Sequence, residues 1–380
     1  MMKFFHISDL HIGKRVNGFS MLEDQKYILN QIIELAKEQE PDGIFIAGDL
    51  YDKSTPSAEA VEMVDWFLSQ AAQLGIKVWA ISGNHDSAER VAYGSRMLEQ
   101  AGIHMAKVFD GTLQSYTYTK EGDEKAYIWL LPYIRPAQVR RFFPDKTIDT
   151  THQAVKAVLE TAKLQHDGTN ILIMHQFIAG AAVCDSEEMS IGGLDQVDVS
   201  VLEGFDYVAL GHLHRPQKVM GENVRYCGSP LKYSFSEAGQ EKSVTVIETG
   251  PEPGKIKIDT LPLVPRLDLR EMKGPMEKIL QKEVSASANP EDYLHITLTD
   301  EEEILDAIGK VREVYPNIMK LDFESSGQKS QEEETEIQID KKTPGELFAE
   351  FFFRQNGRDM NQKQEKTVEK LMNEIFGSDV

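Results

Sequence analysis

The chain is poor in cysteine and has no long hydrophobic run. Its two cysteines, Cys184 and Cys227, are too few for a disulfide framework, and their spacing matches no zinc motif. No apolar stretch approaches the roughly 18 residues that a membrane span needs. The N-terminal segment "MMKFFHISDLHIG" turns polar too early for a signal peptide. We therefore expect a cytoplasmic protein with reduced thiols and no membrane association.

An excess of basic residues is also lacking. The formal net charge of -21 argues against a protein that coats nucleic acid through bulk electrostatics. It does not exclude a nuclease, because carboxylates that bind divalent cations count as negative charges. There is no P-loop pattern, so any dependence on ATP must come from a partner.

Five short apolar runs in the first two thirds of the chain each lead into polar residues. Amphipathic helical stretches separate these runs, which predicts an α/β domain with a largely central sheet. The runs are "KFFHIS" before Asp9, "GIFIAG" before Asp49, "KVWAIS" before Gly83, "NILIM" before His175 and "YVAL" before Gly211. Because ligands of α/β sheets bind beyond the carboxyl ends of the strands, we expect the five polar clusters to meet at one site.

The spacing of two residue pairs indicates metal binding. Asp9 and His11, like His212 and His214, are two residues apart at a strand end, so both side chains of each pair can face one spot. Three further donors follow other strands: Asp49, Asn84 and His175. A mixed set of oxygen and nitrogen donors suits manganese or iron better than calcium and is typical of two-metal hydrolases.

The composition changes after residue 263. We predict a large domain over residues 1–263 and a small β-α-β-α-β domain over residues 264–325, with a capping box at Thr299 and Glu302 starting its second helix. Residues 326–343 are polar and acidic, which predicts a flexible linker. Residues 344–377 have the pattern of a helical hairpin. Its apolar stripe comprises Leu347, Phe348, Phe351, Phe352, Val368, Leu371, Met372 and Ile375.

The motifs "DLH", "GDLYD", "GNHD", "MH" and "GHLH" together resemble those of the calcineurin-like metallophosphoesterase superfamily. The longer segments "HISDLHIGK", "GDLYDKSTPS", "ISGNHDS", "GHLHRPQ" and "YCGSPLKYSFSE" are similar to the SbcD family, the nuclease subunits of SbcCD complexes. The similarity extends over nearly the whole chain. It implies a two-sheet sandwich flanked by helices, a small DNA-binding cap domain and a C-terminal helical hairpin that binds a partner.

The resemblance also implies a ligand set for two Mn²⁺ ions, with Mg²⁺ or another divalent cation as an alternative. The first ion would take Asp9, His11, Asp49 and His214, and the second would take Asp49, Asn84, His175 and His212. Asp49 would bridge the two. His212 and His214 would then share a strand end because each serves a different ion.

Two residues beside the ligand Asn84 are expected to be catalytic by the same resemblance. His85 would donate a proton to the leaving oxygen, and Asp86 would orient it. A second reading, in which His85 only binds the phosphate, stays open. Some relatives carry a histidine where this chain has Asp52, which puts a second imidazole acting on DNA in doubt.

The implied function is that of a manganese-dependent DNA nuclease, with 3′–5′ exonuclease action on double strands and endonuclease action on single strands and hairpins. The implied partners are DNA and an SbcC-type coiled-coil ATPase bound by the C-terminal helices, with a homodimer of this chain inside a heterotetramer. Two alternatives stay open. One is a small-molecule phosphodiesterase, and the other is a non-catalytic scaffold that clamps DNA.

Overall fold

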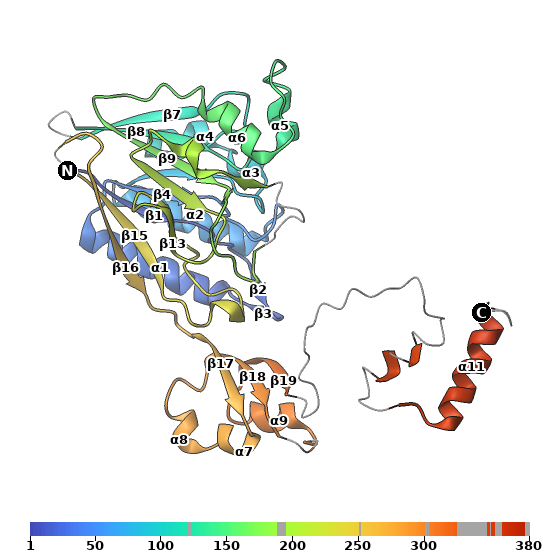
Figure 1. Cartoon of the computed structure of the whole chain (residues 1–380). Coiled ribbons are helices and arrows are strands. Elements are labelled where there is room, and N and C mark those ends of the chain that lie inside the picture. Colours follow the sequence, from blue (N-terminus) through green and yellow to red (C-terminus); the bar gives the residue numbers. More distant parts are fainter. Residues whose placement is uncertain are drawn as a thin grey trace.

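The computed structural model describes residues 1–120, 124–187, 195–250, 252–300, 302, 304–324, 348–349, 351–353 and 359–376. The described residues form a large α/β unit and a smaller α/β unit beneath it in Figure 1, followed by helical segments near the C-terminus. None of the helices in these ranges combines the length and apolar character that crossing a bilayer requires. The predicted linker, residues 326–343, lies outside the described residues.

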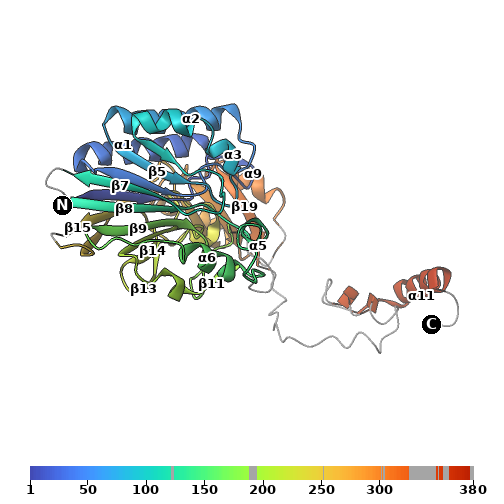
Figure 2. The same ribbon diagram turned by 90° about the horizontal axis from the view of Figure 1, so that it is seen from above.

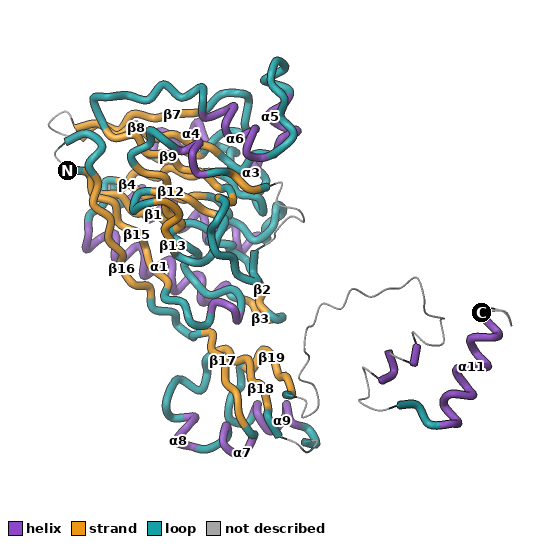
Figure 3. Tube along the Cα trace, in the orientation of Figure 1, coloured by secondary structure: helices purple, strands orange, loops and turns teal. Residues whose placement is uncertain are grey.

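Two six-stranded sheets form the large unit (Figure 3). The first has the order β16-β15-β1-β4-β5-β6. Its strands are β1 (Lys3–Ile7), β4 (Gly43–Ala47), β5 (Lys77–Ile81), β6 (Ile103–Met105), β15 (Lys242–Thr249) and β16 (Ile256–Leu263). The second has the order β13-β14-β12-β9-β8-β7. Its strands are β7 (Gln114–Lys120), β8 (Glu124–Leu131), β9 (Thr169–His175), β12 (Tyr207–Gly211), β13 (Gln217–Met220) and β14 (Val224–Tyr226).

Helices cover the outer face of each sheet, as Figure 2 shows from above. The first sheet packs against α1 (Leu22–Gln39) and α2 (Ala58–Gln73), where Ile28, Ile32 and Phe67 join one buried apolar cluster with Phe5 and Ile46. The second packs against α6 (Thr151–Leu159), with α5 (Pro136–Arg140) beside it. The result is a sandwich with two sheets between two helical layers.

The expectation of one central sheet was wrong, whereas the two-sheet sandwich implied by the family resemblance is confirmed. Strands β1, β4 and β5 belong to one sheet, and strands β9 and β12 belong to the other. A third apolar cluster fills the space between the sheets, with Phe4, Phe45 and Trp79 facing Ile171 and Tyr207. A strand buried on both faces reads as a continuous apolar run in either arrangement, so sequence periodicity alone could not separate them.

Helix α2 shows how local sequence sets the element boundaries. The Ser57 side chain accepts a hydrogen bond from the Ala60 amide at 3.3 Å, which caps the first turn. The helix ends at Gln73, and Gly75 follows with a φ of 75°, a conformation that suits glycine.

The small unit is a parallel sheet of β17 (Leu269–Gly274), β18 (Tyr293–Leu298) and β19 (Ile318–Phe323). Helices α7 (Met276–Ile279), α8 (Lys282–Ser285) and α9 (Ala307–Arg312) connect the strands. The predicted capping box at Thr299 is wrong, because α9 begins at Ala307 and is capped by the Asp306 side chain. The Thr299 amide instead donates to the Gly274 carbonyl at 3.1 Å and continues the pairing of the sheet.

A buried carboxylate on α1 joins the two units. Asp24 is fully buried and accepts hydrogen bonds from Arg266 Nε at 3.1 Å and from the Tyr293 hydroxyl at 2.8 Å. Its neighbour Gln25 points to the loop after β1, where its Nε2 donates to the carbonyl of His11 at 2.7 Å. Consecutive residues of one helix therefore contact the small unit and the loop that follows β1.

Short elements complete the described fold. They are β2 (Arg15–Val16), β3 (Phe19–Ser20), β10 (Phe177–Ile178), β11 (Gln196–Val197), α3 (Ala88–Val91), α4 (Ser95–Leu98) and three 3₁₀ turns at Glu99–Ala101, Val199–Leu202 and Phe235–Glu237. Near the C-terminus, residues 348–349 and 351–353 are helical and α11 spans Gln362–Phe376. A groove between these segments is lined by Phe348, Phe352 and Val368. Leu347 and the side chains of Met372 and Ile375 lie outside the described part of the chain.

The close approach of the two sheets predicts a sensitive glycine. A Cβ at Gly211 would clash with the backbone carbonyl of Ala47 on the opposite sheet. We expect Gly211→Ala to lower the free energy of unfolding by about 1–3 kcal/mol, as overpacking does in buried sites. Gly239→Ala is the matched control, since nothing lies within 4 Å of the added carbon there. Urea denaturation of both variants measures the difference, and equal stabilities would contradict the packing argument.

Candidate metal centre

Ends of strands from both sheets supply the predicted ligands. Asp9 and His11 follow β1, Asp49 follows β4 and Asn84 follows β5, while His175 ends β9 and the pair His212 and His214 follows β12. Four of these residues have positive φ angles: Asp9 (52°), His11 (45°), Asp49 (51°) and His212 (106°). Non-glycine residues rarely adopt this conformation, and strained backbone of this kind gathers at functional sites.

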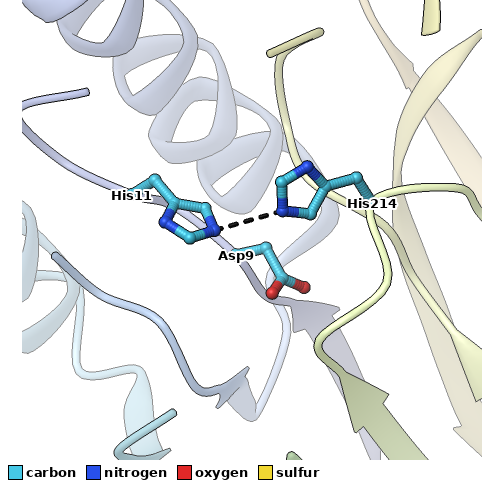
Figure 4. Close-up of side chains that lie close together, drawn as sticks. All are labelled: Asp9, His11 and His214. Carbon is cyan, nitrogen blue, oxygen red and sulfur yellow. Dashed lines mark hydrogen bonds between the residues drawn. The ribbon is translucent and has the colours of Figure 1, made fainter. Parts of the chain in front are cut away.

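Asp9, His11 and His214 form a first group of donors. One ligand atom from each lies within 4.8 Å of the other two, and all three residues are buried. The Nε2 atoms of His11 and His214 are 3.1 Å apart, and Figure 4 shows the two rings facing each other beside the Asp9 carboxylate. Two imidazole nitrogens and a carboxylate that converge on one buried point fit a divalent cation.

Asn84, His175 and His212 form a second group. His175 Nε2 and His212 Nδ1 each lie 3.0 Å from the Asn84 side-chain oxygen. His175 Nδ1 donates to the carbonyl of Ala47 at 2.7 Å, so its Nε2 is the atom turned to the site. These three donors also fit a divalent cation.

Asp49 lies between the groups. Its Oδ2 is 3.6 Å from His11 Nε2 of the first group and 3.3 Å from His175 Nε2 of the second. Its Oδ1 accepts the amide of His85 at 3.0 Å, which fixes the carboxylate. A carboxylate in this position could be shared by two cations.

Burial and mutual charge shift the pKa values in this cluster. Burial alone would raise the pKa of Asp49, but positive charge on His175 and His11 outweighs it and holds the pKa well below its ordinary value. Burial would lower the pKa of His175, but the Asp49 charge raises it to about 9. Burial lowers the pKa of His212 to about 3, so this imidazole is neutral near pH 7.

His85 and Asp86 occupy the loop beside this centre but do not contact each other as predicted. His85 Nδ1 lies 3.1 Å from the backbone carbonyl of Asp52. The Asp86 carboxylate accepts the amides of Leu50, Tyr51 and Gly83 at 3.0–3.1 Å. Among the described contacts, the atom that meets His85 Nδ1 is the Asp52 carbonyl oxygen rather than the Asp86 carboxylate.

The Asp86 carboxylate instead forms hydrogen bonds with the loop after β4 and with the loop after β5. Its partners Leu50 and Tyr51 follow the candidate ligand Asp49, and its partner Gly83 precedes the candidate ligand Asn84. Burial, followed by the charge of Asp49, raises the pKa of Asp86 to about 6, and the three amides oppose that rise.

The side chain of Asp52 faces a lysine. Asp52 Oδ1 lies 3.0 Å from Lys14 Nζ and 3.8 Å from His11 Nδ1. Lys14 also lies over the Tyr233 ring, 5.5 Å from its centroid. The positively charged ammonium group of Lys14 therefore lies at the edge of the first ligand group.

Sequence reasoning missed the residues that hold His214. Ser186 Oγ lies 2.7 Å from its Nδ1, the Glu187 carboxylate accepts its amide at 2.5 Å, and Lys242 Nζ donates to its carbonyl at 2.8 Å. Glu237 is fully buried behind Ser186. Burial would raise the pKa of Glu237, but His214 and Lys242 hold it well below its ordinary value. Glu237 closes the segment "GSPLKYSFSE", which was the one available signal.

Comparisons with known proteins place the chain among known families. The model of the calcineurin-like phosphoesterase family matches residues 2–216, and a model described as the type 5 capsule protein repressor C-terminal domain matches residues 265–356. The chain is 34% identical over 383 residues to the SbcD subunit of the nuclease SbcCD from Staphylococcus epidermidis, with 99% of each chain covered.

Two solved structures also match. A dimetal phosphatase from Danio rerio is 10% identical with a TM-score of 0.41, over 69% of this chain and 98% of the other. The protein TT1561 of Thermus thermophilus is 13% identical with a TM-score of 0.37, over 68% and 98%. Because the family model matches and the similarity to the SbcD subunit extends over both chains, the chain belongs to the calcineurin-like phosphoesterase family and is a metal-dependent phosphodiesterase related to the SbcD nucleases.

Proposed function

We propose that this chain is the nuclease subunit of an SbcCD-type complex and hydrolyses DNA phosphodiesters at a centre of two Mn²⁺ ions. The observation that carries the proposal is the position of Asp49, whose Oδ2 lies within 3.6 Å of a histidine nitrogen from each ligand group. The full-length identity to an SbcD nuclease supports DNA as the substrate. By the same relationship, double strands would be degraded 3′–5′ and single strands and hairpins would be cut internally.

Seven side chains would hold the two ions. The first ion fits Asp9, His11, Asp49 and His214, and the second fits Asp49, Asn84, His175 and His212. When bound, the ions supply Lewis acidity that activates water and neutralises charge on the phosphate. The histidine-rich donor set favours Mn²⁺ over Mg²⁺.

In this mechanism His85 donates the proton that the leaving oxygen needs. Its Nδ1 proton is held by the Asp52 carbonyl, so the Nε2 side of the ring is left to face the substrate. His85 stands beside the first ligand group, with its ring centroid 4.8 Å from that of His11. Asp86 acts on His85 indirectly, by fixing the loops that carry Asp49 and Asn84.

The C-terminal helices would bind the ATPase partner. Phe351, Phe353 and Leu371 are about half exposed on the helical segments. Exposed apolar side chains of this kind favour contact with a partner protein, which removes them from water. An amphipathic pair of helices suits the coiled-coil base of an SbcC-type ATPase. Tyr93 and Met97, 86% and 78% exposed near α4, support pairing of two copies of this chain within a heterotetramer.

Hydrolysis of a small phosphodiester on the same centre is the second candidate. Nothing in the metal site distinguishes it from a nuclease. The small α/β unit and the apolar C-terminal segments favour the nuclease, because a small-molecule enzyme has no use for them. A non-catalytic DNA clamp is disfavoured, because it gains nothing from a full two-metal ligand set.

Removal of divalent cations should abolish activity. We expect EDTA to stop hydrolysis of labelled duplex and hairpin DNA and added Mn²⁺ to restore it, because the ligands carry the activating ions. Elemental analysis of desalted, Mn²⁺-loaded protein should give about two ions per chain, and about one for His214→Ala. His152→Ala, a substitution on α6, is the control and should keep both. DNA cutting in excess EDTA would contradict the proposed centre.

The proton-donor role of His85 predicts a dependence on the leaving group. His85→Gln should lower the rate of DNA hydrolysis about 10²–10⁴-fold, since general acid catalysis contributes that much. Hydrolysis of bis-para-nitrophenyl phosphate should fall far less, because nitrophenolate leaves without protonation. Rates on both substrates at saturating Mn²⁺ measure the difference. An equal loss on both would favour the alternative that His85 only binds the phosphate.

A further inference from the structure

A chain of three polar groups leads away from His214 into the protein interior. His214 Nδ1 lies 2.7 Å from Ser186 Oγ, and Ser186 Oγ lies 2.7 Å from Glu237 Oε1. The three residues come from different segments: the turn after β12, the loop after β10 and the 3₁₀ turn Phe235–Glu237. Fold topology therefore brings them together.

The Glu237 carboxylate at the inner end meets hydrogen-bond donors. Its Oε2 lies 2.6 Å from Lys242 Nζ in an ion pair whose two side chains are at most 4% exposed. Its Oε1 also accepts from the Tyr233 amide at 3.2 Å and from the Ser234 hydroxyl at 3.1 Å. A carboxylate in these surroundings is ionised and acts as an acceptor only.

The direction of each hydrogen bond then follows. A serine hydroxyl has one proton, and Ser186 gives it to the ionised Glu237. Ser186 Oγ can therefore only accept from His214, so Nδ1 of that ring carries its proton. In a neutral imidazole the other nitrogen is then a lone-pair donor. His214 Nε2 is the atom that faces His11 and Asp9 in Figure 4.

We propose that Glu237 and Ser186 form a relay that fixes the tautomer and ring orientation of His214, so that its Nε2 lone pair is held toward the first ion. Ser186 is thus a positioning residue and does not itself bind metal or substrate. Outer partners of this kind commonly fix metal-binding histidines, with a carboxylate or carbonyl accepting the second N–H. Here the nearest acceptor is the Ser186 hydroxyl at 2.7 Å, with Glu237 Oε1 behind it at 3.5 Å from the same His214 nitrogen. The inference rests on the proposed function, in which His214 is a metal ligand.

The hydroxyl of Ser186 can be removed without releasing the backbone of His214. The His214 amide donates to Glu187, and its carbonyl accepts from Lys242 Nζ and from the Ser229 amide. The Ser186 side chain therefore acts on the imidazole ring rather than on the turn. This separation makes the relay testable by single substitutions.

The experiment compares the full-length wild type with three variants. Ser186→Ala deletes the relay, Ser186→Thr keeps a hydroxyl, and Ser234→Ala removes another hydroxyl on Glu237 that does not reach His214. The first readout is the tautomer of His214 in metal-free protein, from ring ¹³C and ¹⁵N shifts of labelled histidine. The second is Mn²⁺ affinity by calorimetry. Urea denaturation checks that all variants fold.

We expect His214 to carry its proton on Nδ1 in the wild type, in Ser234→Ala and in Ser186→Thr, and to lose this preference in Ser186→Ala. Mn²⁺ affinity at the first site, which includes His214, should fall about tenfold or more in Ser186→Ala and recover in Ser186→Thr. A wild-type His214 protonated on Nε2, or unchanged affinity in Ser186→Ala, would overturn the relay. Failure of the wild type to bind Mn²⁺ would count against the proposed function, and the tautomer signal would still decide the relay.

Discussion

The hydrogen bond from His175 Nδ1 to the carbonyl of Ala47 joins the two sheets at the edge where the ligands meet. It requires the sheets to approach closely, which Gly48 and Gly211 permit because a Cβ on either would clash across the gap. Donors from β1, β4 and β5 thereby face donors from β9 and β12. The candidate metal centre depends on the contact between the sheets, and neither sheet contains all of its residues.

The same edge carries backbone strain. Left-handed conformations at Asp9, His11, Asp49 and His212 cost on the order of 1–3 kcal/mol each. Hydrogen bonds oppose this cost. The Asp9 amide donates to the backbone carbonyl of Gly48, and the His11 amide donates to the backbone carbonyl of Asp49. The His212 amide donates to the Asp9 carboxylate. These bonds link the ligand loops to one another, so each loop is held in its strained form by its neighbours.

Sequence could predict that these polar residues meet in space because each follows an apolar strand, and because a spacing of two residues turns two side chains to one side. It could not assign the strands to two sheets, since both arrangements bury the strands on both faces. The partners Ser186 and Glu237 stayed hidden because they are 51 residues apart and meet only in the fold. The partners of Asp86 were hidden for a similar reason, because its carboxylate accepts amides of another loop, such as that of Leu50.

Helix α1 connects the small unit to the loop that follows β1. Asp24 is held by Arg266 and Tyr293 of the small unit, and the next residue, Gln25, holds the carbonyl of His11. Adjacent residues of one helix therefore connect the small unit to the backbone of the loop that follows β1. A displacement of the small unit would have to strain these bonds or carry helix α1 with it.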